Sequence, residues 1–488
     1  MVNVLMVSAE SVPFAKVGGM ADVVGSLPSA LKRMGADVRV LMPGYGQIPH
    51  DKFNIRYLLS FKFAHNRGVS DVTLYTTEHD GVTYYLLQAW PYFGSEAQVY
   101  HDYSWDLPRF IFFNQVAMAA VWELRHTIGW DADVLHTHDW HTGLLPFLID
   151  INRTNPHWWH VATVHTIHNL AYQGNWAGPA LRQAGIPPRT HSHLVYQDLT
   201  DNLMAIALAY SNMITTVSPR YAIEIQYPQQ GYDLDGMIRT RMADLVGILN
   251  GIDTGLWDPA TDPYINTHYD GSNFLEGRAA NKAELQREMN LPVRPDVPMI
   301  GIVSRLVWQK GIDMLVPALY RLLEEFDIQF VALGAGEPRF EWEMARLGSE
   351  RYARGARVFV GYDAAVAQRI YASADLFAMP SHFEPCGIGQ MLAMRYGSLP
   401  VVRETGGLVD TVENYDNADG DSGTGFTFSW AQPDAVYNTF RWAIETYLHR
   451  RDAFQRMQVR AMQQDFSWEA SARSYLGVYD RALSMKRG

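Results

Sequence analysis

The chain has 488 residues, of which 48% are apolar and 19% charged, and its formal net charge at pH 7 is −12. This composition predicts a folded protein with full hydrophobic cores and excludes a disordered one. The acidic balance disfavours nucleic acid and anionic membranes as main partners, so any phosphate must be bound by individually placed residues. A single cysteine cannot form an internal disulfide, and no apolar run is long enough to span a bilayer. We therefore expect a cytoplasmic protein.

Short β-rich runs alternate with amphipathic stretches in two series along the chain. The first series predicts strands at 2–7, 38–42, 84–87, 134–137, 161–165 and 213–217, and the second at 299–303, 330–333, 358–360, 376–379 and 399–402. Such alternation is typical of right-handed βαβ units, so both halves should be α/β domains with parallel sheets. Segment 250–264, rich in Gly, Asp and Pro, is predicted to be the hinge. An amphipathic helix without an evident docking partner should follow Trp468.

A glycine loop lies between the first strand and a helix expected from about Met20 to Arg33. It contains Lys16 and the pair Gly18-Gly19. Backbone N–H groups and the helix dipole at this place could bind phosphate, and Lys16 adds a positive charge. The loop lacks the G-x-G-x-x-G and P-loop patterns, and a glycine pair in a β–α turn is more often just a tight turn. Its functional interpretation therefore depends on other parts of the chain.

Two cations follow the first strand of the second half. Arg305 offers a planar fork to a phosphoryl group, Lys310 adds a compact charge, and Gly311 opens a helical pattern. Such pairs usually belong to a solvated basic turn. Their place at the carboxyl end of a strand in an acidic chain favours a clamp for a diphosphate.

A carboxylate, the only cysteine and two glycine-opened turns follow the strand at 376–379. Gly387 and Gly389 flank the start of a helical pattern, where a phosphate could approach the backbone without meeting a Cβ atom, and residues 406–407 repeat this arrangement. Glu384 and Cys386 lie in the same stretch. A carboxylate among anion-binding groups suits a ligand that also carries neutral hydroxyls. We infer a site for a nucleotide sugar.

Histidines cluster in the segments HTHDWH, residues 136–141, and HTIHNL, residues 165–170. The first nearly matches the H-x-H-x-D-H pattern of zinc hydrolases, but its aspartate stands one place early and no cysteine cluster completes a ligand set. Neutral imidazoles, carboxylates and an aromatic face such as that of Trp140 also suit sugar binding. Sugar binding is the preferred interpretation, and a zinc hydrolase is the alternative.

These motifs resemble those of the bacterial glycogen synthase and plant starch synthase family, over essentially the whole chain. The matching segments are KVGGMADV (16–23), HTHDWHTGLLP, VHTIHNLAYQG, TTVSPRYAIEI, GILNGIDTGLWDPATD, SRLVWQKG, FEPCG and TGGLVDTV. The resemblance implies the GT-B fold, in which two Rossmann-like parallel-sheet domains face each other across a donor cleft. It implies an acceptor-side domain at 1–250, a donor-side domain at 251–467 and a C-terminal helix at 468–488.

The resemblance also implies a retaining transfer of glucose from ADP-glucose to the non-reducing end of an α-1,4-glucan or maltooligosaccharide. ADP is released, and neither a cofactor nor a metal is expected. The residues that it implies as catalytic are Glu384, Arg305, Lys310 and His168. Those implied to bind the donor are Lys16, Gly19, Asp22, Asn250, Tyr362, Cys386, Gly387, Ile388, Gly389, Thr405, Gly406 and Gly407. On the acceptor or sugar side it implies Asp139, Trp140 and Tyr172. By the same resemblance, Tyr362 stacks on the adenine and Glu384 binds the hydroxyls of the donor glucose.

Three positions depart from the usual family pattern. Gly389 and Ala205 stand where many members have threonine and lysine, and Leu392 stands where the wider superfamily often has a second glutamate. Two further alternatives therefore stay open, a UDP-glucose donor and a catalytically silent glucan-binding relative. The intact clamp and glycine loop favour an active enzyme.

Overall fold

The computed structural model describes residues 1–349 and 352–487, and the chain divides into two compact units. The first unit comprises residues 1–251 together with the chain from Trp468 onward, and the second comprises residues 252–467. The chain thus leaves the first unit inside the segment predicted to be the hinge. Within the described ranges, no helix combines the length and apolar character needed to cross a bilayer.

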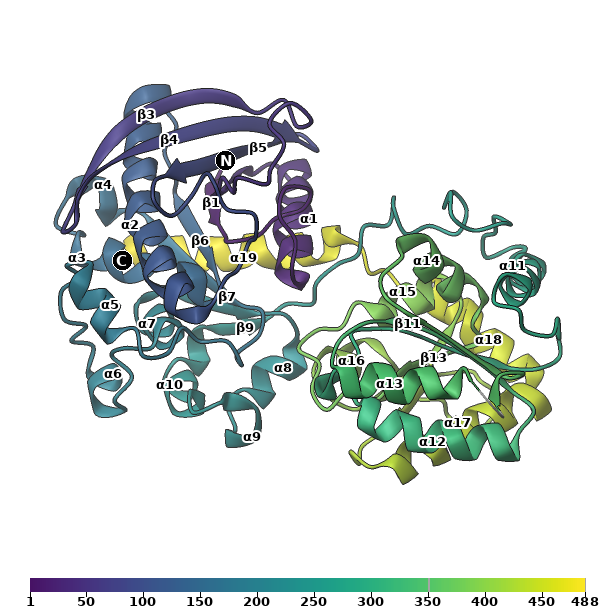
Figure 1. Cartoon of the computed structure of the whole chain (residues 1–488). Helices are drawn as coiled ribbons and strands as arrows, with labels where there is room; N and C mark the ends of the chain where they lie inside the picture. The colour runs from purple at the N-terminus through teal and green to yellow at the C-terminus, as the bar shows by residue number, and fades with distance from the viewer. Residues whose placement is uncertain (350–351, 488) are drawn as a thin grey trace. The chain divides into compact units, whose positions relative to one another are not determined.

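The first unit is built on a nine-stranded sheet with the order β3-β4-β5-β2-β1-β6-β7-β8-β9 (Figure 1). Its strands are β1 (Asn3–Val7), β2 (Asp37–Pro43), β3 (Arg56–His65), β4 (Gly68–His79), β5 (Val82–Ala89), β6 (Val134–His138), β7 (Ala162–Ile167), β8 (Met213–Thr216) and β9 (Leu245–Gly247). From β5 through β2, β1 and β6 to β9 all pairings are parallel. The predicted parallel core is therefore confirmed.

The prediction of an entirely parallel sheet is wrong at one edge. Strands β3 and β4 form an antiparallel hairpin, and β4 also pairs antiparallel with β5. Asp80 and Gly81 connect β4 to β5, both with positive φ (48° and 71°), as the tight hairpin turns favoured by Asp-Gly require. That dipeptide was the available sequence signal. Exposed side chains interrupt the apolar pattern of β3 and β4. For this reason, hydrophobic periodicity did not predict these two strands.

The helices of the first unit surround this sheet. They are α1 (Gly19–Arg33), α2 (Tyr103–Ile128), α3 (Leu145–Ile151), α4 (Pro156–Trp159), α5 (Gly178–Gln183), α6 (Ser192–Tyr196), α7 (Leu203–Tyr210), α8 (Pro219–Glu224), α9 (Pro228–Gly231), α10 (Asp235–Thr240) and α19 (Trp468–Arg487), with short 3₁₀ turns η1 (Trp140–Thr142) and η2 (Met242–Asp244). Helix α19, drawn in yellow in Figure 1, packs against α1 and β7. Its buried face follows helical spacing through Ala472, Tyr475, Tyr479 and Ala482. The docking partner that the sequence left open is thus the first unit.

The second unit has a six-stranded, fully parallel sheet with the order β12-β11-β10-β13-β14-β15. Its strands are β10 (Met299–Val303), β11 (Gln329–Gly334), β12 (Ala356–Val360), β13 (Leu376–Met379), β14 (Leu399–Arg403) and β15 (Phe426–Phe428). Its helices are α11 (Phe274–Glu288), α12 (Ile312–Glu325), α13 (Pro338–Leu347), α14 (Ala364–Ser373), α15 (Gly389–Arg395), α16 (Gly407–Thr411), α17 (Pro433–His449) and α18 (Arg451–Met462), with the 3₁₀ turn η3 (Trp308–Lys310). Figure 1 shows α12, α13 and α17 on one face and α14, α15 and α18 on the other. Burial on both faces explains why β10 and β13 read as continuous apolar runs and were predicted with their observed bounds.

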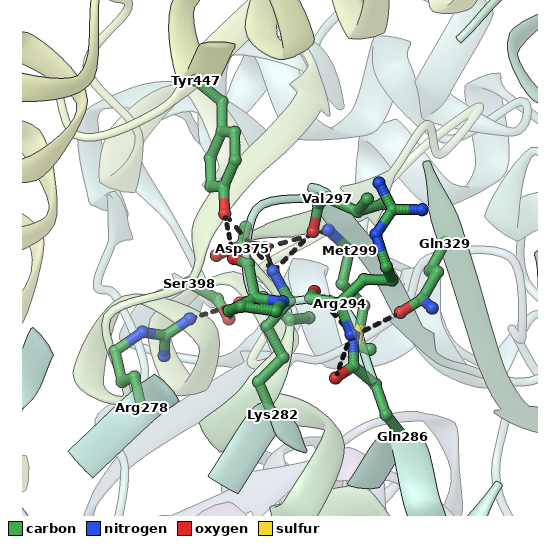
Figure 2. A network of polar contacts seen from close by, with 12 residues as sticks. Arg278, Lys282, Gln286, Arg294, Val297, Met299, Gln329, Asp375, Ser398 and Tyr447 are labelled. Carbon is green, nitrogen blue, oxygen red and sulfur yellow. Dashed lines mark hydrogen bonds and ion pairs between the residues drawn. The ribbon is translucent and has the colours of Figure 1, made fainter. Parts of the chain in front are cut away.

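A buried ion pair lies at the amino edge of this second sheet (Figure 2). Lys282 Nζ on α11 lies 2.7 Å from Asp375 Oδ2, directly before β13, and also donates to the Val297 carbonyl at 2.6 Å and Tyr447 Oη at 3.3 Å. Asp375 Oδ2 further accepts the Met299 N–H at 2.9 Å, at the start of β10. The network therefore joins a helix to the first residues of two central strands.

Candidate functional site

The predicted site residues follow the carboxyl ends of parallel strands in each unit. Lys16 lies beyond β1, and Asp139 and His168 come directly after β6 and β7. In the second unit Arg305 follows β10 and Glu384 follows β13. The carboxyl edge of an open α/β sheet is the usual place for a ligand. Each unit thus offers one candidate edge.

In the first unit, a buried carboxylate organises the glycine loop. Glu10 Oε2 accepts the N–H groups of Val17 at 2.5 Å and Gly18 at 2.8 Å. Lys16 Nζ, on the exposed side, lies 2.6 Å from Asp22 Oδ1 in α1. Two of the loop's N–H groups are therefore already used by the protein. What the loop offers a ligand is the Lys16 ammonium and the first residues of α1.

Glu10 is a site-shaping residue that sequence reasoning missed. Its side chain is buried, and its Oε1 accepts the hydroxyl of Tyr100 at 2.5 Å. The available signal was an acidic residue three positions after an apolar strand, where a carboxylate must find donors to be buried. The partner 90 residues away could not be read from the chain.

Asp139 and His168 join the loops that follow β6 and β7. Asp139 has a φ of 52°, unusual for a residue other than glycine, and its Oδ1 accepts the backbone N–H of His168 at 2.7 Å. Burial raises the pKa of Asp139 to about 7. Asn250, after β9, has a buried Oδ1 atom without a hydrogen-bond partner in the described structure. The resemblance implies that Asp139 is a sugar-side residue, Asn250 a donor-binding residue and His168 a catalytic residue.

The histidines of this edge contact one another and protein hydroxyls. His168 Nε2 lies 3.0 Å from His138 Nδ1, and His136 hydrogen-bonds through both ring nitrogens with Tyr479 Oη at 2.9 Å and Thr166 Oγ1 at 2.6 Å. Burial lowers the pKa of His168 to about 3, so its ring is neutral at pH 7. Across residues 1–349 and 352–487, no three His, Cys, Asp or Glu side chains are arranged to hold a metal ion. The geometry thus offers no support for the zinc alternative.

Trp140, a predicted sugar-side residue, is largely buried in this structure. Trp140 is 6% exposed, and its ring packs edge-on against Phe110 with 5.5 Å between centroids and against His141 at 4.2 Å. Tyr172, another predicted sugar-side residue, is 62% exposed. Of these two aromatic rings, Tyr172 is therefore the one that a sugar can reach in this structure.

In the second unit the predicted catalytic cation and carboxylate are in contact. Lys310 Nζ lies 2.5 Å from Glu384 Oε2, which also accepts the Ser381 hydroxyl at 3.0 Å. The two charged side chains are 18% and 7% exposed. Arg305 is exposed and donates to Gln309 Oε1 at 3.2 Å, and no carboxylate of the described chain pairs with it. A full positive charge therefore stands free beside a lysine–glutamate pair.

Two glycines allow the loop after β14 to pack on the Glu384 loop. A Cβ atom on Gly406, whose φ is 47°, would lie 1.9 Å from the Glu384 carbonyl oxygen, and one on Gly407 would lie 2.0 Å from that of Cys386. The Gly407 N–H already donates to the Glu384 carbonyl at 3.1 Å. The Gly407 N–H is therefore already used within the protein. Close backbone approach explains the pair. Thr405, directly before it, is buried.

The remaining predicted donor residues differ in exposure. Tyr362, after β12, is 84% exposed, so its ring is free to stack on a base. The Cys386 thiol is buried and forms no disulfide. Gly387 has a φ of 72°, and Ile388 caps α15, which begins at Gly389. The helix start predicted at this position is therefore confirmed.

A side chain at the first residue of α15 would be crowded. A Cβ atom on Gly389 would lie 3.3 Å from both Met379 Sδ and Phe377 Cε1 at the end of β13. A bulkier residue at this position would require those two neighbours to move by a few tenths of an ångström. Gly389, which departs from the usual family pattern, therefore lies where the packing beneath the Glu384 loop is tight.

Comparisons with known proteins match both units. Residues 3–240 match the family model described as starch synthase catalytic domain, and residues 297–445 match that described as glycosyl transferases group 1. Glycogen synthase 1 of Geobacter metallireducens is 41% identical over 100% of this chain and 97% of its own length. The glycogen synthase of Moorella thermoacetica is 40% identical over 99% of this chain and 98% of its own length.

Solved structures show the same architecture. The catalytic domain of starch synthase IV from Arabidopsis thaliana, bound to ADP and acarbose, matches with a TM-score of 0.88 and 32% identity, covering 99% of both chains. A sucrose-phosphate synthase from Thermosynechococcus elongatus matches with a TM-score of 0.63 at 16% identity, which supports the fold alone. These matches confirm the predicted fold class, with a Rossmann-like α/β sheet in each unit.

Proposed function

Because the chain belongs to the glycogen and starch synthase family of glycosyltransferases, we propose that it transfers glucose from ADP-glucose to the non-reducing end of an α-1,4-glucan. The transfer retains the anomeric configuration and releases ADP. The observation that carries this proposal is the group of Arg305, Lys310 and Glu384 at the carboxyl ends of β10 and β13. It joins two cations suited to a diphosphate with a carboxylate suited to sugar hydroxyls.

Charge flow gives each member of this group a role. As the bond from glucose C1 to the diphosphate breaks, negative charge grows on the leaving oxygen and positive charge on the sugar ring. Arg305 and Lys310 stabilise the leaving group more strongly in the transition state than in the ground state. Glu384 Oε2 holds Lys310 in place. Glu384 Oε1, with no hydrogen-bond donor to it in the described structure, is left to accept from a hydroxyl of the glucose.

The carboxyl edge of the first unit is proposed to contact the sugars. His168, Asp139 and Asn250 are polar and buried or half-buried, and Tyr172 is exposed. None of them is assigned a covalent role. Retention is proposed to follow from attack of the acceptor hydroxyl on the same face as the leaving diphosphate, which takes up its proton.

Donor choice and acceptor need are tested in one experiment. The purified full chain is incubated with ADP-glucose or UDP-glucose, each with and without maltooligosaccharide, and the products are sized. We expect elongation by single glucose units from ADP-glucose. Faster transfer from UDP-glucose would overturn the donor assignment, and binding of glucan without transfer from either donor would identify a catalytically silent relative. Because a single cysteine cannot form an internal disulfide, the cytoplasm remains the expected compartment.

A further inference from the structure

His168 exposes one ring nitrogen and shares the other with a buried histidine. Its Nε2 lies 3.0 Å from His138 Nδ1, while its Nδ1 has no hydrogen-bond partner in the described structure. The His168 residue is half-buried at the carboxyl edge, and Asp139 Oδ1 fixes its backbone N–H at 2.7 Å. A ligand at this edge would therefore meet Nδ1, and the chemistry of Nδ1 depends on where the ring proton resides.

His138 is completely buried, and its ring is held from behind. The His136 ring lies 4.3 Å away between centroids and inclined by 33°. His136 is itself fixed by its hydrogen bonds with Tyr479 of α19 and Thr166 of β7. The second nitrogen of His138, Nε2, is buried and has no hydrogen-bond partner among the residues that the structure describes. His138 thus has one bonded nitrogen, facing His168, and one that finds no partner.

Two proton arrangements satisfy a contact between two neutral imidazoles. In the first, His138 Nδ1–H donates to His168 Nε2, and the buried His138 Nε2 carries a lone pair. In the second, His168 donates, and the His138 proton must then reside on the buried Nε2. Buried N–H groups without an acceptor are rarer in proteins than buried acceptors without a donor. The first arrangement is therefore favoured, and it places the proton of His168 on the exposed Nδ1.

We propose that His138 is a positioning residue that holds His168 as its Nδ1–H tautomer, so that the carboxyl edge of the first unit presents a hydrogen-bond donor. Its acceptor would be a hydroxyl or ring oxygen of the transferred glucose. This role rests on the proposed function, in which His168 lies beside that sugar. A neutral donor of this kind binds and orients the sugar, and it cannot act as a general base through Nδ1, because that nitrogen already carries a proton.

The tautomer is measured on the full chain, without any ligand. Protein labelled with ¹⁵N-histidine is examined by two-bond ¹H–¹⁵N correlation at pH 7, and His168 is assigned by loss of its signals in the variant His168→Gln. We expect the proton of His168 on Nδ1 in the wild type and a shift toward Nε2–H in His138→Leu. A wild-type His168 protonated on Nε2 would overturn the proposal, whatever the enzyme transfers.

Activity provides the second readout. The amide nitrogen of His138→Asn can replace the Nδ1–H donor, whereas His138→Leu cannot. We expect His138→Asn to keep kcat near the wild-type value and His138→Leu to lose about tenfold or more, the scale for removing an orienting partner. His165→Leu is the matched control, since His165 is equally buried but bonds Thr137 Oγ1 at 2.8 Å instead of His168. Equal losses of kcat in His138→Asn, His138→Leu and His165→Leu would reduce His138 to packing and overturn its positioning role.

The two readouts separate this proposal from the proposed function. If His168 is protonated on Nδ1 but His168→Gln transfers glucose at the wild-type rate, the tautomer assignment stands and the placement of His168 beside the sugar is wrong. If transfer depends on His168 but its proton resides on Nε2, the proposed function stands and the role of His138 is overturned.

Discussion

One lysine–carboxylate pair lies at each end of the neighbouring strands β10 and β13, and the two lysines differ in how completely they are hydrogen-bonded. At the amino edge, Lys282 pairs with Asp375 at 2.7 Å, and at the carboxyl edge Lys310 pairs with Glu384 at 2.5 Å. Burial is similar, with side-chain exposures of 5% and 9% in the first pair and 18% and 7% in the second. Residue type and burial alone would not distinguish them.

At the amino edge, the protein satisfies all three donors of the lysine. The Lys282 ammonium reaches three acceptors, and one Asp375 oxygen accepts both that ammonium and a backbone N–H (Figure 2). At the carboxyl edge, the Lys310 ammonium reaches Glu384 alone among the described residues. In each pair one carboxylate oxygen accepts two hydrogen bonds and the other accepts none from the described residues, so the two pairs differ at the lysine. A buried charge that lacks hydrogen-bond partners lowers the stability of the folded state, so its presence calls for an explanation. We interpret the first pair as structural and the second as kept incomplete for a substrate.

The largest effect is expected from breaking the amino-edge pair. Asp375→Ala leaves the Lys282 ammonium buried without its carboxylate, so it should lower the free energy of unfolding of the second unit by about 3–5 kcal/mol. Urea denaturation followed by circular dichroism measures this loss. In the double variant Lys282→Met/Asp375→Ala, which buries no unpaired charge, most of the stability should return. A loss below about 1 kcal/mol in the single variant, as at an exposed ion pair, would remove the structural interpretation.

Removing the cations at the carboxyl edge should lower turnover. We expect Lys310→Ala to lower kcat by about 10²–10³, the scale for losing one preorganised charge stabiliser. Arg305→Ala, which breaks no ion pair, is the companion variant. Steady-state kinetics with ADP-glucose decide the matter. A rise in KM with kcat intact would mean that these cations bind the ground state and the transition state equally.

Lowering the pH should destabilise the first unit, because the carboxyl edge of its sheet contains neutral histidines rather than ion pairs. Burial lowers the pKa of His165 to about 3, below the value of about 6.5 in an unfolded chain. Its contribution to stability is therefore complete above pH 6.5 and is lost as the pH falls toward 3, because the unfolded chain then binds a proton that the native state excludes. His165→Asn should flatten the pH dependence of unfolding by at most about 1.4 kcal/mol per pH unit in that range. Equal slopes in both proteins would contradict the neutral state of this ring.

The smallest effect is expected next to the incomplete pair, at Cys386. The thiol is buried, and the cations already handle the charge of the leaving group, so the chemistry does not require a nucleophilic sulfur. Cys386→Ser should keep substantial transfer activity and lose any sensitivity to thiol reagents. Complete loss of turnover in a folded Cys386→Ser protein would instead indicate covalent catalysis.

The sequence predicted those parts of the molecule that depend on local pattern. Continuous apolar runs identified β10 and β13, and residues at strand ends identified the loops of Arg305 and Glu384. Contacts between distant segments could not be predicted in this way. Asp375 meets a lysine 93 residues earlier in the chain, and no periodicity encodes such a pair.

Burial of single side chains was equally hidden in the sequence. Trp140 belongs to a polar motif suited to sugar binding, and the packing of α2 against it becomes visible only in three dimensions. Gly407 reads as a phosphate-binding residue, whereas its N–H group holds the neighbouring loop. Sequence patterns therefore locate the candidate site, and the hydrogen-bond partners decide which groups remain for a ligand.

The most direct test of this account compares the wild type with Glu384→Gln in transfer from ADP-glucose to maltotriose. Gln keeps the size of the side chain and removes its charge. ADP binding is measured by calorimetry, and products are sized by mass spectrometry. The account predicts that the wild type lengthens the acceptor by single glucose units with equimolar release of ADP. It predicts that Glu384→Gln binds ADP with an unchanged Kd but loses most of its transfer activity. A wild type that elongates nothing, or a Glu384→Gln variant that transfers at the wild-type rate or loses its affinity for ADP, would contradict it.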